Sequence, residues 1–362
     1  MFDIPARIRR VRDELDKQQL DALLVSQPEN RRYLSGFTGS AGYLLISSRA
    51  ALLLSDFRYM TQGPEQAPDY EFVRIERGFP KQGLRAILER AGGSRIGFEA
   101  EHMTVAGQAA WLEGLQAAGP SVDLVPTEQL VERLRAVKDE QELAIIAEAV
   151  RVVDDAWAKL RESIKPGLTE RQVAWRLEQL IREEGAEALS FPTIIASGPN
   201  AAKPHHGISE REIRSGEPIV CDFGAKYQGY CSDITRTVCI GPPDGRFEEI
   251  YALVLDAQTT AEQRIVPGIE ARRGDEYARQ VIASAGYGEQ FGHGLGHGVG
   301  LEVHEAPTMG PSGTLTLEPS MTVTVEPGVY LPEWGGVRIE DICFVRQNGL
   351  EVVNKATKDP RI

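Results

Sequence analysis

Two stretches of the chain decide its fold: IVCDFGAKYQGYCSDITRTV at residues 219–238 and TVTVEPGVYLPEWGGVRIEDI at residues 322–342. Each stretch contains two runs rich in β-branched residues on either side of a turn, with Gly229 in the first turn and Gly335 in the second. Both stretches are therefore predicted to form β-hairpins.

Each predicted hairpin carries two carboxylates on facing strands. A turn centred on residues 227–228 places Asp222 opposite Asp233. A symmetric turn in the second stretch places Glu326 opposite Glu340. Directly opposed residues on one face of a hairpin have Cβ atoms roughly 4.5–5.5 Å apart, where like charges repel. Shared protons or bound cations relieve such repulsion. Two divalent ions would balance four carboxylates, whereas one proton relieves a single pair, so we favour two metal ions.

The alternative explanation is that these carboxylates are ordinary solvated charges on exposed strand faces. That explanation suits a single pair better than two matching pairs, and His297 between the two stretches adds a further metal-binding side chain. A set of carboxylates and imidazole suits divalent ions such as Mn²⁺, Co²⁺, Fe²⁺ or Zn²⁺. Since such ions can activate water for attack at neutral pH, hydrolysis is the predicted reaction class.

The composition excludes several kinds of partner. The chain has 362 residues, of which 40 are basic and 53 acidic, and its net charge is −13. This charge disfavours binding to a phosphate backbone or to an anionic membrane surface. The first residues, MFDIPARIRRVRDELDKQQL, lack the apolar core of a signal peptide, and no run has the length of a membrane span. We therefore expect a soluble, cytoplasmic protein without nucleic-acid or membrane partners.

The four cysteines form no CxxC pair and are too few for a disulfide scaffold. They are Cys221, Cys231, Cys239 and Cys343. Strand alternation puts Cys221 on the face opposite Asp222, which favours a core position, whereas Cys231 shares the face of Asp233. We expect free thiols in a reducing compartment.

The chain is predicted to hold two domains, at residues 1–128 and 135–362. The first combines a starting helix over residues 4–20 with strand-like runs such as GYLLISS and RAALLLSDF, a mixture typical of an α/β domain. After Pro126 the sequence becomes a charged stretch, and we place the boundary there. A long amphipathic helix follows, because Asp139 and Glu142 resemble a capping box and apolar residues then recur at helical spacing.

The second domain is predicted to be doubled. Residues 165–185 lead through a loop with His205 to the first hairpin, and residues 266–286 lead through a loop with His304 to the second. Corresponding positions in the two halves are offset by 99 to 107 residues. A pseudo-twofold domain follows, in which each half is a helix pair packed on a hairpin. The carboxylates would then meet at its concave centre.

Five of the six histidines lie between the two hairpins or just before the first of them. They are His205, His206, His293, His297 and His304. A lone histidine is more often structural than catalytic, but clustering favours a functional site. The segment FGHGLGHGVGLEVHE at residues 291–305 alternates glycine with other residues, which permits close approach of the backbone to a ligand. It lacks the GK[ST] of a phosphate loop, and the chain has no G-x-S-x-G elbow.

Several motifs resemble those of the proline-specific metalloexopeptidases, Xaa-Pro aminopeptidase and Xaa-Pro dipeptidase (prolidase). These motifs are CDFGAKYQGYCSDITRT, GHGLGHGVGLEVHE, VTVEPGVYLPE and GGVRIED. The N-terminal segments NRRYLSGFTGSAG and LLLSDFRY are similar to the creatinase-type domain of the same enzymes. The resemblance implies an α/β (α+β) protein with a creatinase-like N-terminal domain, followed by a pseudo-twofold pita-bread catalytic domain related to methionine aminopeptidase.

The resemblance also implies a dinuclear metal site. Asp222 would bind one ion, while His297 and Glu326 would bind the other. Asp233 and Glu340 would bridge both ions. We expect Mn²⁺, with Co²⁺, Zn²⁺ or Fe²⁺ as alternatives.

Further roles follow from the same resemblance. His205 and His304 match positions that contact the scissile carbonyl or the prolyl residue, and His293 matches a histidine that lines the pocket. Glu326 would carry a proton to the leaving imide nitrogen. Arg338 would orient the carboxylates, and its alternative is an exposed strand arginine.

Three aromatic residues are candidates for the apolar wall around the substrate proline. They are Phe191, Tyr330 and Trp334, and each is equally compatible with packing in the core or at the rim. Some dipeptidases of this kind carry an arginine shortly after the His-Glu pair, and here Ala306, Pro307 and Thr308 follow that pair.

The predicted function is therefore an Xaa-Pro aminopeptidase, which hydrolyses the bond between an N-terminal residue and a following proline. Xaa-Pro dipeptidase (prolidase) is the alternative. A non-catalytic peptide- or protein-binding member of the fold is an alternative of another class, but it predicts losses among the five metal ligands, and none is lost. The intact ligand set also disfavours a metal-free, creatinase-like amidine hydrolase. The resemblance implies a homodimer.

Overall fold

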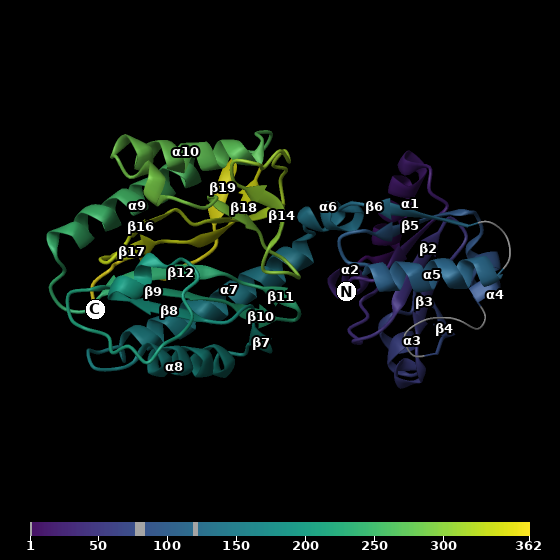
Figure 1. Cartoon of the computed structure of the whole chain (residues 1–362), viewed down its shortest axis with the longest axis horizontal. Helices are drawn as coiled ribbons and strands as arrows, with labels where there is room; N and C mark the ends of the chain where they lie inside the picture. The colour runs from purple at the N-terminus through teal and green to yellow at the C-terminus, as the bar shows by residue number, and fades with distance from the viewer. Residues whose placement is uncertain (1, 77–83, 119–121) are drawn as a thin grey trace. The chain divides into compact units, whose positions relative to one another are not determined.

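The structure is a computed structural model that describes residues 2–76, 84–118 and 122–362. It divides into two compact units, Met1–Arg135 and Ala136–Ile362, and each has its own sheets and helices (Figure 1). The domain limits that we expect from the sequence, 1–128 and 135–362, stay predictions, because compactness does not by itself show independent folding.

The N-terminal unit is built on a six-stranded sheet with the order β4-β3-β2-β1-β5-β6. The strands are β1 (Ala22–Val25), β2 (Tyr43–Ser47), β3 (Ala51–Ser55), β4 (Glu71–Arg74), β5 (Arg95–Glu99) and β6 (Asp123–Thr127). Strand β2 runs antiparallel to both of its neighbours, and the other pairs are parallel. The two apolar runs predicted as strands are β2 and β3.

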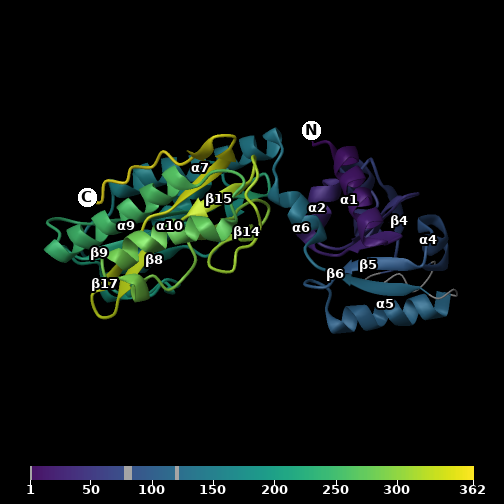
Figure 2. The same ribbon diagram turned by 90° about the horizontal axis from the view of Figure 1, so that it is seen from above.

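Helices cover both faces of this sheet. They are α1 (Ile4–Gln18), α2 (Pro28–Ser35), α3 (Gln62–Gln66), α4 (Leu84–Ala91), α5 (Val105–Ala118) and α6 (Leu130–Ala136), with the 3₁₀ turn η1 (Phe57–Tyr59). Helices α1 and α5 lie on opposite faces of the sheet (Figure 2). The inner strands β1, β2, β3 and β5 are therefore largely buried, which explains their continuous apolar runs, whereas the edge strands β4 and β6 are partly exposed. The predicted starting helix is confirmed as α1.

The second unit, Ala136–Ile362, is called the catalytic unit below because the predicted metal ligands lie in it, and it is doubled, as predicted. Its first half contains α7 (Glu140–Arg161), α8 (Glu170–Glu183), β7 (Ala188–Leu189), β8 (Ile194–Ser197), η2 (Gly198–Ala202), β9 (Pro218–Phe223), β10 (Ala225–Tyr227), β11 (Tyr230–Cys231) and β12 (Ile234–Cys239). Its second half contains α9 (Gly245–Arg264), α10 (Ala271–Ser284), η3 (Gly288–Gln290), β13 (Gly296–Gly298), β14 (Glu305–Met309), β15 (Thr322–Val325), β16 (Gly328–Leu331), β17 (Gly335–Arg338), β18 (Asp341–Arg346) and β19 (Gly349–Val352). In the view of Figure 1, α10 lies above the strands of this unit and α8 lies below them.

The segment before the second helix of each half is anchored in the same way. Thr169, before α8, forms a β-bridge with Glu212, and Glu270, before α10, forms one with Thr316. The two halves thus repeat a contact as well as an element order. This repetition places the strands of both halves side by side at the centre of the unit.

Each half has a hydrophobic core. In the first, Trp157 of α7, Leu177 of α8, and Cys221 and Phe223 of β9 are buried together. The Trp157 and Phe223 rings stack with centroids 5.8 Å apart. All four cysteines are free and buried, so the expected free thiols and the core position of Cys221 are confirmed.

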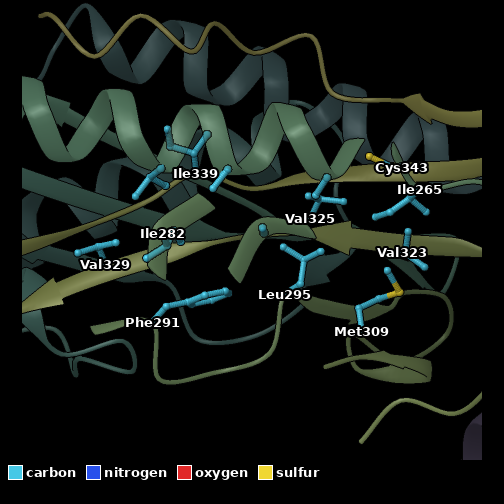
Figure 3. Packing of buried hydrophobic residues seen from close by; sticks show 14 of the residues in the cluster. Ile265, Ile282, Phe291, Leu295, Met309, Val323, Val325, Val329, Ile339 and Cys343 are labelled. Atoms are coloured by element: carbon cyan, nitrogen blue, oxygen red, sulfur yellow. The ribbon is translucent and has the colours of Figure 1, made fainter. Parts of the chain in front are cut away.

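The second core lies between α9, α10 and the strands of the second half. Ile282 of α10, Leu295, Met309 of β14, and Val323 and Val325 of β15 belong to it (Figure 3). Strand residues that face this core alternate with residues that face the centre of the unit. The packing thereby fixes which side chains reach the centre.

Helix α7 begins with the predicted capping box. Asp139 Oδ1 accepts hydrogen bonds from the backbone N–H groups of Gln141 and Glu142, both at 2.9 Å, and Glu142 Oε2 accepts from the Asp139 N–H at 3.0 Å. Replacing Asp139 by Ala is expected to destabilise the catalytic unit by about 1 kcal/mol. This loss corresponds to a decrease of roughly 2–4 °C in the thermal unfolding midpoint of a unit of this size. The matched control is Asp155→Ala, which removes an exposed aspartate from the same helix; an equal decrease there would contradict a specific capping effect.

The first hairpin has a different register from the predicted one. Tyr227 pairs with Tyr230, so the two-residue turn consists of Gln228 and Gly229. Both turn residues have positive φ, 46° and 85°, as a type I′ turn requires. The predicted turn centre was wrong by one residue because it left Gly229 outside the two central positions.

This shift changes the partner of Asp222. Thr235, and not Asp233, lies opposite Asp222 in the β9–β12 ladder. Asp233 is two residues before Thr235, so Asp222 and Asp233 are diagonal neighbours. Diagonal neighbours on one face are still close enough for longer side chains to interact.

The register predicted for the second hairpin is confirmed. In the β15–β18 ladder Val325 lies opposite Asp341, and in the β16–β17 ladder Gly328 lies opposite Arg338. The two ladders therefore share one register. Glu326 and Glu340 are therefore opposed where one ladder ends and the other begins.

Among the described residues, no helix has the length and apolar character needed to cross a membrane.

Candidate metal centre

Three of the predicted ligands form a compact cluster in the centre of the catalytic unit. One ligand atom each of Asp233, His297 and Glu340 lies within 4.8 Å of the others. Asp233 follows β11, His297 is the central residue of β13, and Glu340 joins β17 to β18. Both carboxylates are almost fully buried. One segment of the first half and two of the second thus bring one donor each to the same place.

The other two predicted ligands adjoin this cluster. The Nε2 atom of His297 lies 3.2 Å from Glu326 Oε1 and 3.6 Å from Asp233 Oδ2. Asp222 connects to Glu340 through two side chains: Arg338 donates to Asp222 and to Thr235, and Thr235 donates to Glu340 at 2.7 Å. Glu326 is therefore in direct contact with the cluster, and Asp222 is linked to it through two side chains.

Three oxygens of the cluster are buried without a hydrogen-bond donor. Within the described part of the chain, Asp222 Oδ1, Asp233 Oδ1 and Glu340 Oε1 have no partner. A buried carboxylate oxygen without a donor is costly, and a bound cation removes that cost. The carboxylate and imidazole donors also match the ligand preferences of Mn²⁺, Co²⁺, Fe²⁺ and Zn²⁺. These residues therefore fit a divalent metal site.

The electrostatics of the cluster divide its carboxylates into two kinds. Burial raises the pKa of Asp222 against the opposing charge of Arg338, and burial reinforced by neighbouring carboxylates lifts the pKa values of Asp233 and Glu340 well above their usual range. Burial also disfavours ionisation of Glu326, but the hydrogen bond and the positive charge of His297 hold the pKa of Glu326 at about 2. The same ion pair raises the pKa of His297 against the effect of burial. Both shifts favour the charged forms of His297 and Glu326.

His304 and His205 lie at the accessible side of the cluster. The His304 ring is 4.1 Å from the His297 ring, between centroids, at an angle of 66°. Burial and the neighbouring His297 lower the pKa of His304. His205 is exposed and lies near enough to Asp222 and His304 to interact electrostatically with both. His206 instead contacts Glu170 at 3.0 Å.

His293 is linked to Asp222 by a chain of hydrogen bonds. The Tyr330 hydroxyl lies 2.9 Å from His293 Nε2 and accepts from Arg338 at 2.8 Å, and Arg338 donates to Asp222 Oδ2 at 2.6 Å. Since His293 Nδ1 faces the Gly294 carbonyl at 2.7 Å, we assign the ring proton to Nδ1, and Tyr330 then donates to Nε2. This neutral form agrees with the pKa of His293, which burial lowers.

Arg338 is buried, with 3% of its surface exposed. The alternative of an exposed strand arginine is therefore wrong. Of the three aromatic candidates, Tyr330 contacts the cluster through Arg338. Phe191 lies against Gly224, and the Trp334 indole donates to Asp244 at the start of α9. Among the contacts that the described residues make, none joins Phe191 or Trp334 to the carboxylates.

Two threonines at the centre were not singled out from the sequence. Thr235 bridges Arg338 and Glu340, and Thr324 accepts from the His297 backbone N–H at 3.0 Å and donates to Glu326 at 3.1 Å. Each lies two residues from a predicted ligand, so strand alternation puts it on the same face. The alternation of side chains along a strand was the sequence signal that could have identified both threonines.

The alternating glycines allow strands, as well as ligands, to approach closely. A Cβ atom on Gly296 would lie 2.3 Å from the Thr324 carbonyl oxygen, and one on Gly298 would lie 2.1 Å from that of Ala306. Both positions flank His297. Only glycine permits the close packing of β13 between β14 and β15 that fixes this histidine.

Comparison with known proteins agrees with this geometry. Residues 144–347 match the model of metallopeptidase family M24, and residues 7–137 match the creatinase/prolidase N-terminal domain. The chain belongs to metallopeptidase family M24. The predicted family and the predicted combination of a creatinase-like domain with a pita-bread domain are thereby confirmed.

Relatives of known name extend over the whole chain. It is 40% identical over 353 residues to the uncharacterized peptidase YqhT of Bacillus subtilis, covering 98% of this chain and 99% of that protein. It is 37% identical over 358 residues to the Xaa-Pro dipeptidase of Pyrococcus horikoshii, covering 98% of each.

Solved structures of similar proteins have the same fold. The Xaa-Pro dipeptidase from Bacillus anthracis superposes with a TM-score of 0.95 at 40% identity, covering 99% of this chain and 100% of that one. The X-Pro aminopeptidase from Thermotoga maritima superposes with a TM-score of 0.88 at 34% identity, covering 98% and 100%. This M24 chain is therefore a metallopeptidase similar to proline-specific enzymes.

Proposed function

We propose that this M24 metallopeptidase is an Xaa-Pro dipeptidase, which hydrolyses the bond before proline in dipeptides. The observation that carries the proposal is the buried cluster of carboxylates with unpartnered oxygens, in a chain 37–40% identical to proteins named Xaa-Pro dipeptidase. The sequence alone favours an aminopeptidase, because no arginine closely follows the His304-Glu305 pair. A cation elsewhere in the site can bind the carboxylate of a dipeptide, so the missing arginine does not exclude a dipeptidase. We therefore give more weight to the named relatives.

The metal ligands that we propose are the five residues of the cluster. They are Asp222, Asp233, His297, Glu326 and Glu340. Two divalent ions, with Mn²⁺ as the expected metal, would supply Lewis-acid polarisation of the scissile carbonyl and an activated water. The remaining chemistry belongs to side chains of the chain itself.

Proton transfer and substrate binding fall to residues around the cluster. Glu326 is ionised at neutral pH, since its pKa is about 2, and its role would be to take the proton of the attacking water and deliver it to the departing proline nitrogen. His304 and His205 are accessible beside His297 and Asp222, where donors can stabilise developing negative charge on the carbonyl oxygen. His293, Tyr330 and Arg338 would hold Asp222 in place.

A second candidate function is Xaa-Pro aminopeptidase activity on longer peptides. Two observations favour it: Ala306, Pro307 and Thr308 supply no cation after the His-Glu pair, and the X-Pro aminopeptidase from Thermotoga maritima is 34% identical to this chain. The two candidates differ in whether the substrate needs a free carboxylate on proline.

A paired substrate assay distinguishes the two functions. Protein loaded with Mn²⁺ is given Xaa-Pro, its amide Xaa-Pro-NH₂, and Xaa-Pro-Yaa. For a dipeptidase, we expect kcat/KM for the free dipeptide to exceed the others by about 10-fold or more, because an unpaired buried charge in the site costs over 1.4 kcal/mol. Equal or faster cleavage of the tripeptide would establish the aminopeptidase instead. The dipeptide Xaa-Ala serves as the control for proline specificity.

The predicted homodimer and cytoplasmic location remain part of this proposal. The homodimer is expected from the family resemblance, and sedimentation of the purified protein tests it.

A further inference from the structure

Lys138 and Glu305 form a buried ion pair that none of the proposed steps uses. The Lys138 Nζ atom lies 2.7 Å from Glu305 Oε1, and the two side chains are 1% and 3% exposed. Lys138 Nζ also donates to the Ala136 carbonyl oxygen at 3.1 Å. Two charges removed from water in this way need close geometry to be stable, so each strongly fixes the position of the other.

The Glu305 carboxylate organises the loop that precedes it. A Cβ atom on Gly300 would lie 2.3 Å from Glu305 Oε1, so the carboxylate packs directly against the backbone of Gly300. The Gly300 N–H donates to the Glu302 carbonyl at 3.0 Å, and the Glu302 N–H faces Glu305 Oε2 at 3.5 Å. The loop at residues 299–304 therefore closes around this carboxylate.

Both partners are fixed to strands that surround His297. Lys138 donates its backbone N–H to Ser320 at 3.0 Å, and the preceding residue forms a β-bridge with Met321, next to β15. Glu305 begins β14 and lies opposite Gly298 of β13. The ion pair thus joins the strands on the two sides of β13.

His304 directly precedes Glu305, and its ring contacts that of His297 with centroids 4.1 Å apart. Glu305 is the first residue of β14, and His304 is the last residue of the bend at 301–304 that precedes it. Because the two residues are adjacent in the chain, the contact that holds the Glu305 side chain against Lys138 also limits the directions in which His304 can point. Since the His304 side chain is accessible, few other contacts fix its direction.

We propose that Lys138 and Glu305 are positioning residues that hold His304 against His297 at the metal centre. This inference rests on the proposed function, in which His304 contacts the substrate. Removing the charge of Lys138 would let the loop shift while the five ligands stay in place. His304 would then stabilise the transition state less well, and metal binding would be unchanged.

The activity test uses Lys138→Met, which keeps the length of the side chain and removes its charge. We expect kcat for Xaa-Pro to fall roughly 10–100-fold, as for other residues that orient catalytic groups, with unchanged Mn²⁺ content and a KM changed less than kcat. Lys138→Arg should retain most activity. Lys159→Met, at an exposed lysine, is the matched control and should leave activity unchanged. Loss of Mn²⁺ in Lys138→Met would overturn the proposal.

A double-mutant cycle separates positioning from general destabilisation. If Lys138 acts through His304, then Lys138→Met should have little further effect in a His304→Ala background. Effects that multiply would overturn the proposal. Should Lys138→Met fail to fold, Lys138→Met combined with Glu305→Gln removes both charges, and the same comparison in the His304→Ala background decides.

A readout independent of activity keeps this inference distinct from the proposed function. In protein labelled with ¹³C at histidine Cε1, the signal that disappears in His304→Ala identifies His304. That signal should shift in Lys138→Met and stay in place in Lys159→Met. An unshifted signal would overturn the positioning role even if the enzyme proves active. A shifted signal with no cleavage of any Xaa-Pro substrate would refute the proposed function and leave the positioning intact.

Discussion

Replacing Asp233 by Asn is expected to abolish metal retention and peptidase activity while making the metal-free protein more stable. Asp233 lies within the compact cluster with His297 and Glu340, so its loss removes a donor that we propose to be shared by both ions. Activity should fall about 10³-fold or more, because the metal contribution is several kcal/mol and each 1.36 kcal/mol is tenfold in rate.

The stability change has the opposite sign for a physical reason. Burial, and then the facing carboxylates of Glu340, Asp222 and Glu326, raise the pKa of Asp233 well above its usual value. The folded metal-free protein therefore keeps a proton that the unfolded chain releases near pH 4. Its stability falls as the pH rises from about 4 through the folded pKa. Because asparagine does not ionise, the variant does not lose this stability as the pH rises.

Thermal unfolding with and without Mn²⁺ measures both effects. At neutral pH the metal-free variant should unfold at least about 2 °C above the metal-free wild type, equivalent to roughly 1 kcal/mol. The wild type should gain about 2.7 kcal/mol for each bound ion at a metal concentration 100 times Kd, and the variant should gain almost nothing. The control is Asp155→Asn on the surface of α7. A variant that still binds two ions would refute the proposed ligand set.

The cluster itself was largely predictable from the sequence, because it depends on local rules. The second hairpin has a turn whose strands pair symmetrically, so the opposition of Glu326 and Glu340 followed from counting residues. In the first hairpin the same counting failed by one position, because the turn conformation is set by the positive φ of Gln228 and Gly229. A one-residue error in a turn centre shifts every cross-strand partner by two.

Contacts between distant segments were not predictable in the same way. The sequence gives no sign that Lys138 reaches Glu305, which is 167 residues further along the chain. It also left the burial of Arg338 undecided, because the same strand pattern fits an exposed position. These features depend on how β17 packs against β12 and on where the start of the catalytic unit meets β15. Such packing follows from the whole fold and from no local pattern.

Replacing Arg338 by Met is expected to have the second large effect, on stability and on the metal centre together. Arg338 donates to Asp222 at 2.6 Å, to Tyr330 at 2.8 Å and to Thr235 at 3.0 Å, all within the buried centre. Removing the cation leaves Asp222 buried with no compensating charge in the metal-free protein. Breaking a buried pair in this way costs about 3–5 kcal/mol.

The metal state should change the size of this loss. A bound cation would compensate Asp222, so Arg338→Met should destabilise the metal-free protein more than the Mn²⁺-loaded protein. Asp222→Asn combined with Arg338→Met should recover part of the metal-free stability, because no buried charge is then left unpaired. Arg338→Lys should be intermediate, since one ammonium cannot reach all three partners as the planar guanidinium does.

Denaturant unfolding of both metal states tests these expectations. The matched control is Arg346→Met on β18, where the arginine is partly exposed and pairs with Glu351, and the expected loss is about 0–1 kcal/mol. If Arg338→Met costs no more than this control, Arg338 does not hold Asp222. If the loss is the same with and without Mn²⁺, the ion does not share Asp222 with the arginine, and Asp222 leaves the proposed ligand set.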